Sequence, residues 1–149
     1  MNATALMEQL GTAEAAVRAI EGFIDVFATS MPTGKQNTFA AHSLPSTVVV
    51  SVRDDRPISW MGAFERPVPH RRHPDAPVEG YVAQSARRMF AHGAALDKAY
   101  GAPLEPPIVL VADDRINVGD EHPTSQVTEN LKSLQTRTGE ILEQLLEQE

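Results

Sequence analysis

A run of β-branched residues near the middle of the chain most constrains its fold. In the stretch STVVVSVRDD, valines occupy both sets of alternating positions. Val48, Val50 and Val52 alternate with Val49 and Ser51. Because successive side chains of a strand point to opposite faces, this run predicts a strand over residues 46–52 whose two faces are at least partly covered.

The segment from Thr12 to Ser30 predicts a helix that packs on the sheet containing this strand. Apolar residues recur on one helical face at steps of three and four. They are Ala13, Val17, Ile20, Phe23, Ile24 and Phe27. Thr12 is placed to cap the helix, and Pro32 stops it. A helix followed by a strand favours an α/β layer.

Further elements follow this strand. The stretch PISWMGAFERPV predicts either a short second strand or an ordered loop around Gly62, and the proline-rich PVPHRRHPDAP predicts irregular structure. A helix is expected from Val78 to Tyr100, with Gly101 at its C-terminal cap. Its inward residues are expected to be Tyr81, Val82, Ala86, Met89, Phe90 and Leu96. The stretch PPIVLVADD predicts a short buried strand.

The last predicted element is an amphipathic helix from Thr124 to Gln148, with Gly139 as a weak point. Its stripe comprises Val127, Leu131, Leu134, Thr138, Ile141, Leu142 and Leu145. Such a stripe packs in a core or forms a seam for a partner helix. We expect residues 1–110 to form the main part of one unit, and residues 111–149 to add a loop and this helix to the same unit.

The composition limits the class of protein. The chain has 149 residues, 42% of them hydrophobic, and no cysteine, which is sufficient for one domain and gives neither a disulfide nor a thiolate metal site. No apolar run approaches the roughly 18 residues of a membrane span, so we expect a cytoplasmic protein without a membrane partner. The net charge of −7 is divided unevenly: only residues 31–100, with nine basic and six acidic residues, favour an anion.

The stretch SMPTGKQNTFA contains half of a nucleotide-binding loop. A phosphate-binding loop of the Walker type needs glycine five residues before Gly34 and serine or threonine after Lys35, but Thr29 and Gln36 stand there, and the loop follows a helix. What remains is a tight turn with backbone N–H groups, one ammonium and two amides. This chemistry suits contacts to the backbone of a nucleic acid, although a plain polar loop is the alternative.

This stretch, together with LPSTVVVSVRDDRPISWMGAFERPV, resembles the C-terminal part of CasC, the backbone subunit of the type I-E CRISPR surveillance complex Cascade. The family has the same order of a Gly-Lys-Gln-like turn, a hydrophobic strand and an Ala-Phe-Glu block, seen here at residues 33–40, 48–52 and 63–65. The resemblance covers residues 12–101, including the Tyr100-Gly101 step, and is loose beyond them.

The resemblance implies an α/β (α+β) fold that forms part of an RRM-like, or ferredoxin-like, palm with additional C-terminal helices. It implies CRISPR RNA as the ligand, and other copies of the subunit and other Cascade subunits as partners. Target DNA is met indirectly, through the guide. The RNA-binding residues would be Thr33, Gly34, Lys35, Gln36 and Asn37. Because family members are much longer, we expect a fragment or a truncated reading frame, with exposed apolar surface and a tendency to self-associate.

Enzymatic alternatives have weaker support. His70 and His73 are spaced like metal ligands, but they lie in a proline-rich basic loop with two arginines between them. Asp54-Asp55 and Asp113-Asp114 are typical of turns and strand ends. His42 has no nucleophile motif near it. Trp60 either stacks on a base or fills the core.

We therefore expect no catalytic residues, no metal site and no cofactor. Two alternatives to an RNA-binding scaffold stay open. One is a protein-interaction module that binds no RNA. The other is a small metal-dependent hydrolase that uses His70 and His73, or His42.

Overall fold

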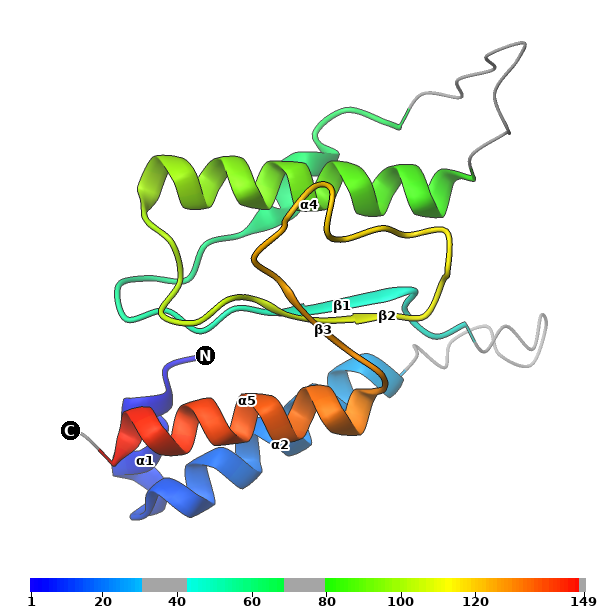
Figure 1. Cartoon of the computed structure of the whole chain (residues 1–149). Helices are drawn as coiled ribbons and strands as arrows, with labels where there is room; N and C mark the ends of the chain where they lie inside the picture. Colours follow the sequence, from blue (N-terminus) through cyan, green and yellow to red (C-terminus); the bar gives the residue numbers. More distant parts are fainter. Residues whose placement is uncertain (31–42, 69–79, 148–149) are drawn as a thin grey trace, which may run out of the picture.

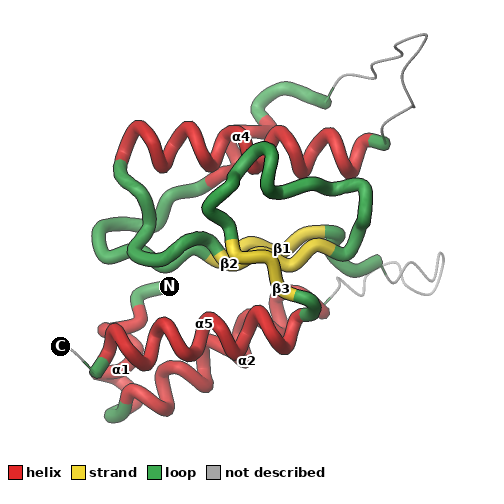
Figure 2. Tube along the Cα trace, viewed as in Figure 1, coloured by secondary structure: helices red, strands yellow, loops and turns green. Residues whose placement is uncertain are grey.

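The computed structural model describes residues 1–30, 43–68 and 80–147. In chain order, two helices are followed by a strand, a 3₁₀-helix, a long helix, two more strands and a last helix (Figures 1 and 2). The helices are α1 (Ala3–Leu10), α2 (Ala13–Thr29), α4 (Tyr81–Tyr100) and α5 (Leu131–Leu146), with a 3₁₀-helix η1 (Trp60–Phe64). The strands are β1 (Thr47–Val50), β2 (Ile108–Val111) and β3 (Gln126–Thr128).

A three-stranded sheet lies between two helical layers (Figure 1). Strand β1 pairs antiparallel with β2, and β2 pairs parallel with β3, giving the order β1-β2-β3. Helix α4 covers one face, while α1, α2 and α5 lie on the other. This mixed α/β arrangement is consistent with an incomplete ferredoxin-like palm, as the resemblance implied.

The alternating valines explain why both faces of the sheet are covered. Val48 and Val50 pack into the core formed by α2, α5 and Ile108. Val49 instead packs into a second core around Phe90 of α4. The predicted strand and the coverage of both its faces are therefore confirmed, although the strand spans Thr47–Val50 and is shorter than the predicted 46–52.

Helix α2 follows its prediction closely at its ends. The Thr12 hydroxyl accepts a hydrogen bond from the Ala15 N–H at 3.1 Å, and the helix ends at Thr29. Its main neighbour is α5, and the two helices share one core with the sheet. A Cβ atom on Gly139 of α5 would lie 3.3 Å from Val17 Cγ1, so this glycine allows close approach of the two helices and is more than a weak point.

Helix α4 corrects the predicted inward face. Ala86 and Phe90 are buried as expected, but Tyr81 and Val82 are exposed. The buried stripe comprises Ala83, Ala86, Phe90 and Gly93. Three of these four residues are small, which allows the helix to lie close to its neighbours. The buried face is therefore centred on small residues and not on the large apolar residues Tyr81 and Val82.

The C-terminal region corrects a predicted boundary. Residues 126–128 form β3, and α5 begins only at Leu131, where the Asn130 side chain accepts from the Ser133 N–H at 2.8 Å. Val127, predicted on the helical stripe, is exposed on the strand. The reason is a pairing with β2, a long-range contact that local periodicity does not report.

Three smaller points complete the fold. Helix α1, capped by Asn2 and ended by Gly11 at φ 84°, was not predicted. The stretch around Gly62 is the 3₁₀-helix η1, so the alternative of a second strand there is wrong. None of the described helices is long and apolar enough to cross a membrane.

Candidate nucleic-acid interface

The five predicted RNA-binding residues, Thr33, Gly34, Lys35, Gln36 and Asn37, lie outside the described residues. Their roles stay predictions. The structure does fix the two ends between which this segment runs, since α2 ends at Thr29 and β1 begins at Thr47. The predicted site therefore connects the end of a helix to a strand at the edge of the sheet.

The end of α2 gives no electrostatic help to phosphate binding. The Ser30 N–H donates to the Val26 carbonyl at 2.8 Å, which satisfies one of the last carbonyls of the helix. A helix C-terminus carries partial negative charge, so it disfavours an anion. Attraction for RNA phosphates at this point must therefore come from a cationic side chain, and Lys35 is the lysine of the predicted site.

An apolar strip leads toward this segment. Phe23, Val26 and Phe27 on the last turns of α2 are exposed, Phe27 by 76%, and the two phenylalanine rings stack with centroids 5.6 Å apart. The helical period predicted that Phe23 and Phe27 lie on the inward face of this helix, and that prediction is wrong. The buried stripe of α2 instead comprises Ala16, Val17, Ile20, Ile24 and Ala28. Exposed apolar surface was expected, and it is present here.

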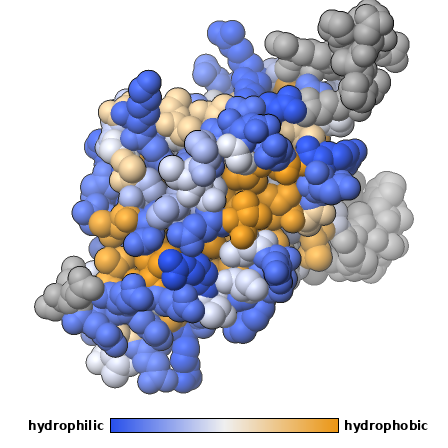
Figure 3. All heavy atoms as spheres, viewed as in Figure 1, coloured by the Kyte–Doolittle hydropathy of each residue, from blue (hydrophilic) through white to orange (hydrophobic). Residues whose placement is uncertain are grey.

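Apolar residues also gather on the face seen in Figure 3. They lie over the sheet, between the layer of α4 and the layer of α5. Among the described residues, Val127 of β3 is also apolar and exposed. Exposed apolar surface of this kind is typical of proteins that bind partners.

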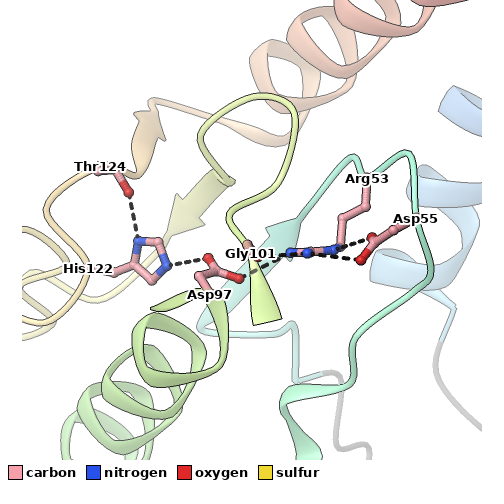
Figure 4. Close-up of polar contacts among 6 residues, drawn as sticks. All are labelled: Arg53, Asp55, Asp97, Gly101, His122 and Thr124. Carbon is pink, nitrogen blue, oxygen red and sulfur yellow. Dashed lines mark hydrogen bonds and ion pairs between the residues drawn. The ribbon is translucent and has the colours of Figure 1, made fainter. Parts of the chain in front are cut away.

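A buried polar network, which sequence reasoning missed, joins three distant segments (Figure 4). Arg53 follows β1, Asp97 lies near the end of α4, and His122 lies in the loop before β3. Asp97 Oδ1 accepts from Arg53 Nη1 at 3.2 Å, and Asp97 Oδ2 lies 3.2 Å from His122 Nε2. Arg53 Nη2 also donates to the Gly101 carbonyl at 2.7 Å.

These groups are well shielded from water. The side chains of Arg53, His122 and Asp97 are 6%, 3% and 11% exposed. Buried charged groups of this kind need partners, and each of these three has one within hydrogen-bond distance. The sequence contains no local signal for this network, because Arg53 stands beside Asp54 and Asp55 and its partner Asp97 lies 44 residues further along the chain.

The contacts of His122 resemble those of a hydrolase triad. Its Nδ1 lies 3.1 Å from Ser125 Oγ and 3.3 Å from Thr124 Oγ1, while Nε2 faces Asp97. Both ring nitrogens are thus engaged, and the ring stacks on Trp60 at 5.5 Å between centroids. A base that has to reach a substrate needs access, and this ring has almost none. The arrangement therefore fits a structural joint.

Trp60 fills the core in the structure. Its ring packs edge-on against Phe90 at 6.4 Å between centroids. A Cβ atom on Gly93 would lie 2.6 Å from the Trp60 ring, so the helix has glycine where the indole crosses it. A tryptophan held on these sides is a packing residue, so the reading in which Trp60 stacks on a base has no support here.

The acidic pairs lie in turns at strand ends, as predicted. A hydrogen bond from Arg53, followed by one from the Arg56 backbone, lowers the pKa of Asp55 to about 2. The hydrogen bond from Arg115 lowers the pKa of Asp113 in the same way. In the part of the chain that the structure describes, no group of three His, Cys, Asp or Glu side chains could hold a metal. His42, His70 and His73 lie outside it.

The lowered pKa of Asp55 predicts how stability depends on pH. A carboxylate with a lowered folded pKa stabilises the fold above its unfolded pKa of 3.8, and this contribution is lost as the pH falls toward about 2. We expect Asp55→Asn to lose stability at pH 7 and to show a shallower decline between pH 4 and pH 2. Urea unfolding across this range measures it, with Asp54→Asn as the neighbouring control. An unchanged slope in Asp55→Asn would contradict the assignment.

Comparison with known proteins places the chain. A family model described as CT1975-like protein matches residues 1–137. The chain belongs to the CT1975-like family. The short name of this family begins with Cas, the prefix of CRISPR-associated proteins, and its match extends beyond residues 12–101, where the sequence resemblance was specific. Comparison with curated proteins finds no significant match.

Solved structures share the fold of this CT1975-like chain. A chain of a "CRISPR RNA-guided surveillance complex" matches with a TM-score of 0.78 at 22% identity, over 95% of this chain and 50% of that chain. A chain of a "CRISPR RNA-guided surveillance complex, pre-nicking" matches with a TM-score of 0.76 at 23% identity, over 95% of this chain and 36% of the other. This chain thus spans about half the length of the first matched chain and about a third of the length of the second.

The resemblance to a Cascade subunit is therefore confirmed at the level of family and fold. The chain is a CRISPR-associated protein with the fold of a surveillance-complex chain. The type I-E assignment and the roles of residues 33–37 stay predictions.

Proposed function

We propose that the chain is a scaffold subunit that holds the backbone of a CRISPR RNA in a Cascade-type complex. The observation that carries this proposal is the agreement of the family match over residues 1–137 with a shared fold over 95% of the chain. The solved relatives are named as RNA-guided complexes. Other copies of this subunit and other Cascade subunits are the proposed partners, with target DNA met through the guide.

The proposed contact is made by Lys35 with Thr33, Gly34, Gln36 and Asn37. The surrounding charge supports this choice, because residues 31–100 carry net positive charge, whereas residues 1–30 and 101–149 carry net negative charge. Phosphate contacts fix the position of a nucleic acid without reading its sequence. This leaves the bases of a guide free for pairing, which is what a scaffold requires.

Lys35→Ala is expected to weaken RNA binding to a similar extent for all RNA sequences. One lost phosphate contact should lower the slope of log K against log salt by about one, while Gln36→Ala should barely change it, because an amide releases no counterion. Fluorescence anisotropy with a labelled CRISPR RNA, over a salt range of about 50 to 300 mM, measures the affinity and the salt slope of each variant. Lys98→Ala, on the last turn of α4, is the matched control.

If Lys35→Ala and Lys98→Ala behave alike, the segment is only a turn and the proposed contact is wrong. The measurement belongs in an assembled complex as well, because an isolated chain offers only part of the binding groove of its longer relatives. If the complex binds RNA while this chain alone does not, and Lys35→Ala leaves RNA binding by the complex unchanged, the chain is better described as a protein-interaction module. The exposed strip of Phe23, Val26 and Phe27 favours that second function.

We further propose that the chain does not cleave nucleic acid. The side chains of His122 and Asp97 are 3% and 11% exposed, and both are already engaged within the fold, His122 with Asp97 and Ser125. Long incubation of RNA or DNA with the chain and Mg²⁺ should leave the substrate intact. Cleavage that copurifies with the chain and is lost in His122→Ala, or in His70→Ala, would overturn this proposal.

A further inference from the structure

Two arginines that contact each other, Arg66 and Arg88, carry charges that the described fold does not neutralise. Arg88 of α4 donates from Nη1 to the Arg66 carbonyl at 2.8 Å and to the Pro67 carbonyl at 3.4 Å. Arg66 follows η1 and is exposed. Among the described residues, no carboxylate forms an ion pair with either arginine, and this includes the neighbouring Glu65.

The other described arginines do have partners. The Arg56 guanidinium lies 6.0 Å from the centroid of the Tyr100 ring. Each of the others forms an ion pair with a carboxylate. They are Arg18, Arg53, Arg87, Arg115 and Arg137. Within the part of the chain that the structure describes, Arg66 and Arg88 are therefore the arginines whose charge is left for an external anion.

The contacts of Arg88 also prepare its guanidinium for binding. Both carbonyl bonds use Nη1, so the N–H donors on Nε and Nη2 remain for an oxyanion. A side chain that is already held in place loses less conformational freedom when a ligand binds. Because the backbone of Arg66 contacts Arg88, the second positive charge starts from the same place on the surface. Two guanidinium groups at one place suit a phosphate.

A shallow apolar groove of about 310 Å³ runs from the arginine pair to the start of β1. Its lining includes Phe64 of η1 and Met89 of α4, which are close in sequence to the two arginines, and Ser46 before β1. The segment that carries Lys35 continues into β1 through Ser46. Phe64 is 39% exposed. Surfaces that bind single-stranded nucleic acid combine cationic groups with an aromatic face for the bases, and this surface has both.

We propose that Arg66 and Arg88 bind phosphates of the RNA that the chain holds, as a second contact point separate from Lys35. The inference rests on the proposed function, because it requires bound RNA, and it adds a site among the described residues. A single phosphate contact fixes one point of a strand, whereas two separated contacts also fix its direction. The strand then passes over the apolar groove, and its bases meet Phe64 without being read.

Salt titrations of RNA binding test the proposal, by anisotropy with a labelled CRISPR RNA and with polyuridylate of the same length. Arg66→Ala and Arg88→Gln should each lower the slope of log K against log salt by roughly 0.7 to 1 for both RNAs, because one phosphate contact is lost. Arg66→Lys should keep the slope, since it keeps the charge. The Arg66 side chain bonds to no described residue, so Arg66→Ala should fold normally, and circular dichroism checks this.

Arg18→Ala on α2 is the matched control, because it removes the same charge from a side chain that is 76% exposed on the other helical layer. It should leave the slope unchanged. If Arg66→Ala and Arg88→Gln behave like Arg18→Ala while Lys35→Ala lowers the slope, this proposal is wrong and the proposed function stands.

The reverse result, in which Arg66→Ala lowers the slope and Lys35→Ala does not, supports the arginine site and overturns the role given to Lys35. The same variants in the assembled complex decide the matter if the chain alone binds too weakly. A complex that holds RNA equally well with Arg66→Ala and Arg88→Gln overturns the proposal. So does one that loses its protein contacts but not its RNA affinity, because the arginine pair then binds a protein.

Discussion

Phe90→Ala is expected to destabilise the chain by about 3–5 kcal/mol. Phe90 is 0% exposed and lies at the centre of the core between α4 and the sheet. It contacts a ring edge of Trp60, and its neighbours include Val109 of β2 and Val118 of the following loop. Removing the ring leaves a cavity between three segments that cannot easily close, because each is also held by its own neighbours.

Urea unfolding followed by circular dichroism measures this loss. Since domains of this size are stable by only about 5–15 kcal/mol, a substantial share of Phe90→Ala should be unfolded at 37 °C. Phe27→Ala is the matched control, because the same change on the exposed face of α2 should stay within about 0.5 kcal/mol. Equal effects of the two changes would show that the α4 face is not the core.

Asp97→Ala is expected to cost about 3 kcal/mol, nearly as much as the loss of a large core side chain. The change leaves Arg53 and His122 buried without their shared acceptor. Arg53 retains Asp55 and the Gly101 carbonyl, so we expect the lower part of the range found for broken buried pairs. His122 retains only the hydroxyl groups of Thr124 and Ser125.

A double-mutant cycle separates the network from a simple loss of packing. If Asp97 acts through Arg53 and His122, adding Asp97→Ala to the Arg53→Met, His122→Phe double variant should cost much less than adding it to the unaltered chain. Asp25→Ala, an exposed acid on α2, should change stability by no more than about 0.5 kcal/mol. Purely additive costs would mean that these three residues act independently, contrary to the geometry in Figure 4.

The predicted site and the polar network differ in how far sequence could reach them. Residues 33–37 could be proposed from the sequence because the turn chemistry and the resemblance both depend on consecutive residues. Arg53, Asp97 and His122 were not found, because their partners are 44 and 25 residues apart along the chain. Nothing local marks one of the chain's aspartates as the acceptor for this arginine, since only folding brings α4 and the end of β1 together.

Within the fold, the sequence by itself determined the elements whose signals are local. The valine run required a strand with two covered faces, Thr12 and Gly101 marked helix ends, and the apolar periods located α2 and α4. These features depend on backbone geometry and on neighbours within one or two turns, so a short stretch of sequence is enough to specify them.

Tertiary structure decided the features that depend on distant partners. Residues 126–128 satisfy a helical pattern, but pairing with β2 makes them a strand. Phe23 and Phe27 satisfy the helical period of α2, yet α5 packs on the smaller residues beside them, where Gly139 permits close approach. Periodicity states that a face is apolar, whereas the shape and spacing of the opposing element decide which part of that face is buried.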